Sequence, residues 1–295
     1  ALQKAIMSDK FYGLSVEAAN SIGSYYDKSD YKKSDLAYQA LKKCLTDLEV
    51  FNKLRPEIRR AIIKNIGIFE REESVRLLEA LVFDKDIGQS DFVRSAAATA
   101  IGMSSKNMPS DVKKSKIIPL LKRLVETTGT FQNVLATGAI DGLKVLYNDI
   151  DKDIIINVAD FLIENTLSTR DYFIRLSATS ALGKFLSTKS LEKDLRIDET
   201  NERVLRQLLV LLNDKRRKIK LNACSSLADE DAKFTNMPNK STYEVIDALK
   251  YLAEHDIDGF VRRRAETSLN VLRKWIKEWS TKTPTLELKI RETDR

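Results

Sequence analysis

The chain has a single histidine and no nucleotide-binding or nucleophile motif, which removes most catalytic classes. A zinc site of the HExxH type needs two histidine ligands, and His255 stands alone. No GxxxxGK[ST] loop, GxGxxG turn or GxSxG elbow occurs. His255 falls at the end of an expected helix, where the helix dipole favours a cation. We therefore expect no catalytic residue, no metal ligand and no cofactor in this chain.

Cysteine, glycine and proline are also scarce. Cys44 and Cys224 fall in expected helices far apart along the chain, so we interpret both as small core residues rather than a disulfide. Unpaired thiols are typical of a reducing compartment, which predicts a cytoplasmic location. Ten glycines and five prolines in 295 residues leave few sites for β-turns, which favours helices.

Long apolar runs are absent as well. No stretch approaches the length of a membrane span, and no signal peptide is recognisable, so we expect no membrane partner. Helical spacing of apolar residues begins at once, with Leu2, Ala5 and Ile6. We therefore expect the chain to be part of a longer protein.

What the sequence does contain is a recurring helix pattern, clearest in residues 90–102 (SDFVRSAAATAIG). Val93, Ala97 and Ile101 lie four residues apart and would share one helix face. Ser90 is a good N-cap residue, and Gly102 favours a helix end. The small residues at 96 and 97 predict that another helix packs closely here.

This pattern returns every 35 to 45 residues. Each copy has an apolar anchor, a small or apolar residue four positions later, and usually a large apolar residue eight positions later; Gly142 is the exception at the last position. The anchors are Leu14, Ile58, Val93, Val134, Ile174, Ile219 and Val261. A period near 40 residues with two helices per unit is the signature of HEAT and armadillo repeats.

The predicted fold is therefore all-α, a right-handed α-α superhelix of about seven helix pairs. We expect a single solenoid over residues 1–280 and an irregular tail over 281–295. Polar insertions are expected at 25–35 and 187–200, and Gly138 and Gly142 should mark tight helix contact. The expected helix pairs are 1–7 and 14–25, 35–48 and 56–69, 72–83 and 91–103, 112–127 and 131–147, 152–166 and 172–186, 201–212 and 216–227, and 241–253 and 260–279.

Basic residues cluster at the starts of two helices in adjacent repeats, within a chain of net charge +7. Helices in adjacent repeats lie side by side, so the cluster could bind phosphates or an acidic partner. A structural alternative is open: basic residues just after the anchors could pair with aspartates of neighbouring repeats, forming an ion-pair ladder. The candidate binding patch consists of Arg216, Arg217, Lys218, Lys220, Arg262, Arg263 and Arg264.

Two segments resemble a known family. Residues 9–19 (DKFYGLSVEAA) are similar to the opening of the HEAT-like region that follows the catalytic domain in some microbial aminopeptidase N-type zinc metallopeptidases. Residues 171–178 (DYFIRLSA) are similar to a turn in the same region. The family's HExxH motif and downstream zinc-binding glutamate have no counterpart here. The resemblance implies a non-catalytic C-terminal appendage, with any zinc in an upstream domain.

Three functions follow as hypotheses. The leading one is that appendage, shaping access to the active site or mediating assembly with its own catalytic domain. The alternative is an independent HEAT-repeat scaffold that binds a protein. The second alternative is a nucleic-acid binder that uses the basic patch of repeats six and seven.

Overall fold

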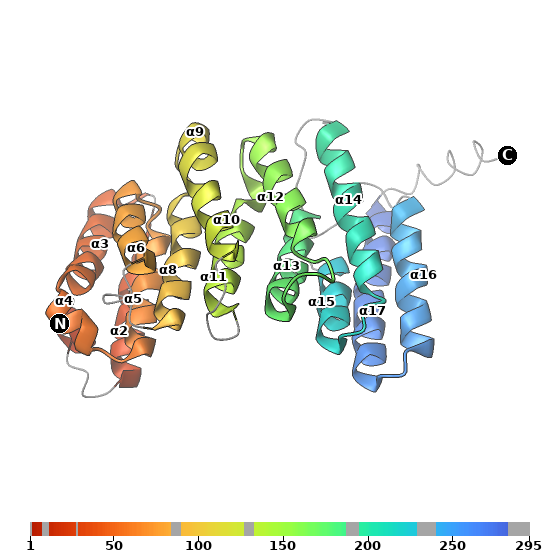
Figure 1. Ribbon diagram of the computed structural model, residues 1–295, viewed down its shortest axis with the longest axis horizontal. Helices are drawn as coiled ribbons and strands as arrows, with labels where there is room; N and C mark the ends of the chain where they lie inside the picture. Colours follow the sequence, from red (N-terminus) through yellow and green to blue (C-terminus); the bar gives the residue numbers. More distant parts are fainter. Residues whose placement is uncertain are drawn as a thin grey trace. The chain divides into compact units, whose positions relative to one another are not determined.

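The computed structural model describes residues 2–7, 12–27, 29–83, 90–126, 133–186, 195–228 and 240–282. These residues form helices joined by short connections, and no strand occurs among them (Figure 1). The all-α prediction is therefore confirmed. The helices divide into two compact units: unit 1 comprises Ala1–Val158 and Asp171–Ser177, and unit 2 comprises Ala159–Arg170 and Ala178–Arg295.

Unit 1 contains the helices from the first four repeats. Each pair has a first helix and a second helix, and the second helices α2, α5, α8 and α11 contact one another in chain order. The helices are α1 (Leu2–Met7), α2 (Tyr12–Gly23), α3 (Tyr31–Thr46), α4 (Leu48–Lys53), α5 (Pro56–Ile68), α6 (Glu72–Phe83), α8 (Asp91–Ser104), α9 (Ser110–Val112), η1 (Lys113–Ile117), α10 (Ile118–Glu126), α11 (Val134–Lys144) and η3 (Val145–Asn148).

The fifth helix pair contributes to both units, and the helices within unit 2 are also paired. In unit 2, α15 contacts α14 and α17, and α17 also contacts α16. The predicted pairing of a first with a second helix is thus present in each unit. The helices are α12 (Lys152–Glu164), α13 (Tyr172–Phe185), α14 (Leu195–Leu211), α15 (Arg217–Leu227), α16 (Lys240–His255) and α17 (Gly259–Lys282).

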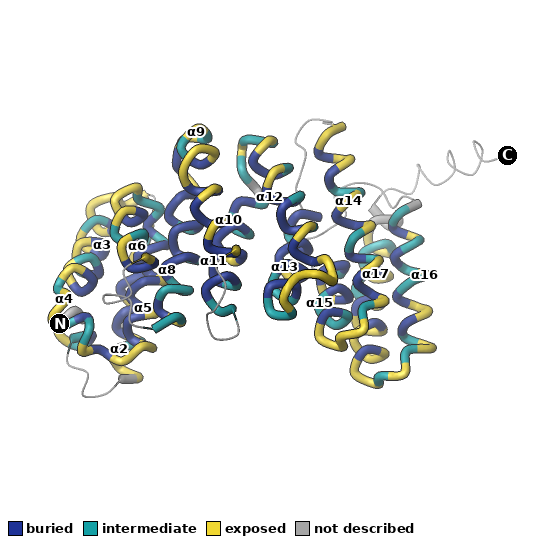
Figure 2. Tube along the Cα trace, in the orientation of Figure 1, coloured by how far each residue is buried: buried dark blue, intermediate teal, exposed yellow. Residues whose placement is uncertain are grey.

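Small residues bring the second helices together, as the sequence predicted. A Cβ atom on Gly138 would lie 2.3 Å from Ser95 Oγ, so α11 and α8 meet backbone to side chain. Thr99 Oγ1 donates a hydrogen bond of 3.0 Å to the Gly138 carbonyl across the same contact. In unit 2, Ser268 Oγ donates to the Cys224 carbonyl at 2.8 Å. The core, dark blue in Figure 2, lies where helices of a unit face one another.

Several helix bounds differ from the sequence prediction. α3 begins at Tyr31, inside the expected polar insertion, because the Asp30 carboxylate caps it by accepting from Lys33 N at 2.9 Å. α14 begins at Leu195, six residues early, and buries Ile197 at 1% exposure. Charged neighbours hid that periodicity in the sequence. The prediction also missed the short helix α4, the π-helical turn η1 and the 3-10 turn η3.

Two of the anchor positions are wrong. Leu14 is 58% exposed, and Ser15 is buried instead, donating to the Ala5 carbonyl at 2.9 Å. In α11 the predicted anchor Val134 is only half-buried, while Leu135 and Leu143 are buried, one position later than the predicted anchor and its partner. That shift explains why Gly142 broke the pattern, because Leu143 occupies the large apolar position.

The expected tail at 281–295 lies largely outside the described residues, although α17 reaches Lys282 and so passes the expected boundary at 280. The right-handed sense of the superhelix and the single domain over 1–280 stay predictions. Within the described part of the chain, none of the helices combines the length and apolar character that a membrane span requires.

Candidate binding surfaces

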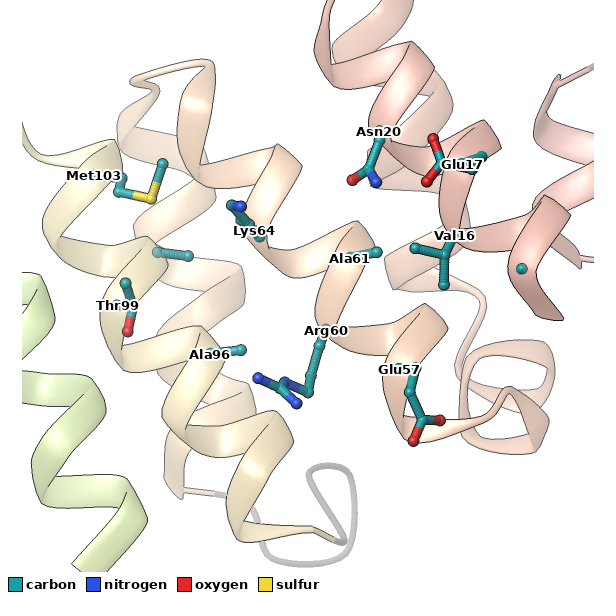
Figure 3. Close-up of a pocket in the computed structure, with 12 residues that line it drawn as sticks. Val16, Glu17, Asn20, Glu57, Arg60, Ala61, Lys64, Ala96, Thr99 and Met103 are labelled. Carbon is teal, nitrogen blue, oxygen red and sulfur yellow. The ribbon is translucent and has the colours of Figure 1, made fainter.

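A groove of about 550 Å³ crosses the second helices α2, α5 and α8 of unit 1. Figure 3 shows the side chains that line the groove projecting from these three helices. Small and apolar side chains line part of it, and polar and charged ones line the rest. The lining residues are Gly13, Val16, Glu17, Asn20, Glu57, Arg60, Ala61, Lys64, Ala96, Thr99, Ala100 and Met103.

Local sequence signals fix the helices that carry this groove. Pro56 occupies the first turn of α5, where its missing N–H costs nothing. Ser90 caps α8 by accepting from Phe92 N at 3.3 Å. Between α5 and α8 a Cβ on Gly67 would meet Ala100 at 3.0 Å, so the helices approach closely. The groove therefore crosses two helices that pack closely against each other.

The charges of the groove are mixed. Glu17 and Glu57 are exposed carboxylates, and Arg60 and Lys64 are exposed cations. The Arg60 guanidinium lies 5.9 Å from the centroid of the Phe92 ring, a cation–π contact from one repeat to the next. Formal charge in the groove is thus balanced, which suits a partner with both apolar and charged side chains.

The basic patch predicted from the sequence lies in unit 2, at the starts of the neighbouring helices α15 and α17. Arg216 is the N-cap of α15, and Lys218, Arg263 and Arg264 are exposed. The structure thus places the basic residues of α15 and α17 on neighbouring helices, as expected for adjacent repeats. Whether the patch binds anything stays a prediction.

Part of the patch is engaged within the protein. Lys220 forms an ion pair with the buried carboxylate of Asp256, and Arg217 lies 3.6 Å from Asp258. Burial alone would raise the pKa of Asp256, but the Lys220 ammonium and the Asp258 amide hold it below the ordinary value. Arg262 donates to the Asp256 carbonyl at 2.6 Å. The Lys220 and Arg217 contacts join repeats six and seven.

The predicted ion-pair ladder along the second helices is only partly present. Asp171 and Asp258 mainly cap their own helices; Asp258 Oδ1 accepts from Phe260 N at 2.8 Å. Arg94 pairs with Asp91 of its own helix, at 2.8 Å. Ion pairs between repeats also join first helices, which the sequence prediction missed because their partners share no fixed spacing. Such pairs are Lys42–Glu73, Lys116–Glu79, Arg203–Asp160 and Arg206–Glu244.

The segment that carries the family resemblance has a local structural role. Asp171 Oδ1 accepts from Phe173 N at 2.8 Å at the start of α13. Burial would raise the pKa of Asp171, but hydrogen bonds from the Asn133 side chain and the α13 backbone hold it below its ordinary value. Helix capping of this kind is general to helix starts and does not identify a family. Residues 9–11 of the other resembling segment lie outside the described residues.

Residues with catalytic potential have structural surroundings. His255 ends α16, stacks on Tyr251 with ring centroids 4.6 Å apart, and lies 3.1 Å from the Tyr251 carbonyl through Nδ1. Cys44 and Cys224 are buried and unbonded, and burial raises the thiol pKa to about 11 and about 12. Both are core residues, as expected, while the cytoplasmic location stays a prediction. No group of three or more His, Cys, Asp or Glu residues suited to a metal occurs in the described ranges.

Comparison with known proteins gives no family. No protein-family model matches the chain, and no curated protein matches it. Among solved structures, a computationally designed armadillo repeat protein for modular peptide recognition has 14% identity and a TM-score of 0.46, over 85% of this chain and 98% of that one. A HEAT-like repeat protein from Thermococcus onnurineus NA1 has 16% identity and a TM-score of 0.44, over 93% and 97%.

A designed armadillo repeat protein in complex with the peptide (KR)4 has 15% identity and a TM-score of 0.40, over 92% of this chain and 99% of that one. At these values the likeness carries no functional inference. The repeat architecture rests instead on the paired helices and their small-residue contacts within each unit.

Proposed function

We propose that this chain is a protein-binding scaffold whose unit 1 groove binds an extended segment of a partner protein. The groove across α2, α5 and α8 supports this proposal, because small side chains such as Ala61 and Ala96 leave room for a chain between charged neighbours. Three helices spaced about 10 Å apart span about 20 Å, enough for roughly six extended residues.

The charges of the groove favour a peptide over nucleic acid. Glu17 and Glu57 would repel phosphates, whereas Arg60 and Lys64 would bind carboxylates. A segment that carries both signs of charge and one or two apolar side chains complements this lining. The binding energy would come mainly from apolar contact and main-chain hydrogen bonds, with charge setting the specificity.

A displayed random-peptide library selected on the purified chain tests this function. Selected peptides should bind in solution, and Lys64→Glu should weaken the peptides that carry an acidic residue by about tenfold. Lys43→Glu is the matched control, because Lys43 is exposed on the first helix α3, away from the groove residues. Equal binding to wild type and Lys64→Glu, or an equal loss in the Lys43 variant, would contradict the groove as the binding site.

We retain as a second proposal that the chain is the C-terminal appendage of an aminopeptidase N-like zinc metallopeptidase. Its support is the resemblance of residues 9–19 and 171–178 alone. The coding sequence ahead of Ala1 decides it. An HExxH motif followed by a zinc-binding glutamate is the expected finding, and a reading frame without them excludes the appendage. The scaffold function does not depend on this result.

A further inference from the structure

The groove of unit 1 defines which positions of a second helix face the open side. On α5 these residues are one position before, and two, three and six positions after, the buried Ile58. They are Glu57, Arg60, Ala61 and Lys64. On α8 the same groove is lined by Ala96 and Thr99, which lie three and six positions after the buried Val93. Consecutive second helices thus line the groove from the same positions relative to their buried anchors, and we call these positions the groove register.

The same register can be read on α15 and α17 of unit 2, which neighbour each other (Figure 1). Their buried anchors are Ile219 and Val261. The side chains in the groove register are all exposed or half-buried. They are Lys218, Leu221, Asn222 and Ser225 on α15, and Phe260, Arg263, Arg264 and Thr267 on α17.

The charge of this face differs from that of the unit 1 groove. None of these eight positions carries a carboxylate, and three carry cations. Lys218, Arg263 and Arg264 have no ion pair or side-chain hydrogen bond to any described residue. The nearby carboxylates of Asp256 and Asp258 are already engaged by Lys220, Arg217 and the α17 backbone.

Apolar groups accompany these cations. Phe260 is 64% exposed, and Leu221 is half-buried on the adjacent helix. The Arg217 guanidinium lies 5.3 Å from the Phe260 ring centroid, so one face of the ring already contacts a cation. The face therefore offers positive charge with apolar contact beside it.

We propose that this α15–α17 face, made by Lys218, Leu221, Phe260, Arg263 and Arg264, binds an acidic peptide segment of a partner protein in which carboxylates alternate with apolar residues. Three unengaged cations match two or three carboxylates. A surface that tracks nucleic acid commonly neutralises about 6 to 10 phosphates, more than this face supplies. The Arg217 contact also leaves less of the Phe260 ring for stacking on a base.

Fluorescence anisotropy on the full 295-residue chain tests this proposal. The probe is a labelled peptide of repeating Asp-Leu-Glu, compared with the neutral peptide of repeating Asn-Leu-Gln. Labelled duplex DNA and duplex RNA form a second arm. Each titration is done at low and at physiological salt, because binding through exposed charges weakens as salt rises.

The test variant is Arg263→Gln/Arg264→Gln, and the matched control is Lys250→Gln/Arg273→Gln, which removes the same charge. Lys250 is exposed on the first helix α16, and Arg273 is exposed on α17, nine residues or two and a half turns after Arg264 and so on the opposite side of that helix. Circular dichroism melts confirm that both variants fold as the wild type does.

The expected result is binding of the acidic peptide but not the neutral one, weakened about tenfold by the test variant and little by the control. Three results would overturn the proposal. One is no preference for the acidic peptide at low salt. Another is equal weakening by the two variants, which indicates net charge alone. The third is tighter binding of duplex DNA or RNA that the test variant abolishes, which assigns the face to nucleic acid. The unit 1 groove is unaltered in every variant, so failure here leaves the scaffold function standing.

Discussion

A Cβ atom on Gly102 would lie 2.2 Å from the carbonyl oxygen of Gly142, so α8 and α11 touch backbone to backbone. No side chain fits at Gly102. The obstructing atom is a helix backbone carbonyl, which cannot move aside as a side chain can by changing its rotamer. Gly102→Ala should therefore destabilise the protein by about 3 kcal/mol or more, through overpacking. Denaturant unfolding measures the loss.

Gly13 provides the matched control, because a Cβ there meets nothing within 4 Å. Gly13→Ala should leave stability unchanged or raise it by up to about 1 kcal/mol, since alanine restricts the unfolded chain. Similar losses in the two variants would mean that the close contact between α8 and α11 is not what Gly102 serves.

Two adjacent alanines of α8 should lose very different amounts of stability on the same substitution. Ala97 is fully buried and Ala96 is half-buried beside the groove. Ala97→Asp places an unpaired carboxylate between helices and should cost about 3 kcal/mol or more, while Ala96→Asp should cost less than about 1 kcal/mol. Thermal melts of both variants check this, and comparable losses would contradict the assigned helix face.

Lys113 and Asp149 form a buried ion pair. Their charged atoms lie 2.5 Å apart, and the side chains are 3% and 2% exposed. Lys113→Met leaves an unpaired buried carboxylate and should destabilise the fold by about 3 to 5 kcal/mol. Lys113→Met/Asp149→Leu should recover much of that loss, because the uncompensated charge is gone.

Lys114→Met is the control for this pair. Lys114 is 43% exposed and pairs with Asp151 at 2.7 Å near solvent, so its loss should change stability little. A double variant at Lys113 and Asp149 that is less stable than Lys113→Met would contradict the desolvation argument. Urea unfolding of the three variants and the wild type gives the comparison.

Asp256 contributes to the pH dependence of stability. Its ordinary pKa of 3.8 applies when the chain is unfolded, and its folded pKa is lower. The stabilisation is therefore complete above about pH 5 and is lost as pH falls through 3.8 toward the folded pKa. Asp256→Asn should lower the melting temperature at pH 7 and flatten the decline below pH 5.

Asp247→Asn is the comparison for this measurement, because Asp247 is exposed on α16 with no ion pair among the described residues. Its melting curve should follow that of the wild type from pH 7 to pH 3. A wild-type melting temperature that rises on acidification would contradict the sign of the pKa shift.

Much of the repeat structure was determined by the sequence alone. The anchors Ile58, Val93 and Val261 each have small or apolar residues four and eight positions later. This spacing located the second helices, because apolar residues four apart share a helix face. Gly138 and Gly142 predicted tight contact, since glycine inside a helix is unfavourable unless close packing requires it. Composition likewise sufficed to exclude an HExxH zinc site, because only one histidine is present.

Tertiary structure decided which charges are available. Arg217 and Arg263 look equivalent in the sequence, yet Arg217 lies against Asp258 and the Phe260 ring while Arg263 has no such partner among the described residues. The groove across α2, α5 and α8 was likewise not predictable, because it depends on side chains from three repeats meeting on one face. Helix periodicity is local and can be read along a chain, whereas ion pairing and grooves depend on distances between residues about 40 positions apart, which only packing fixes.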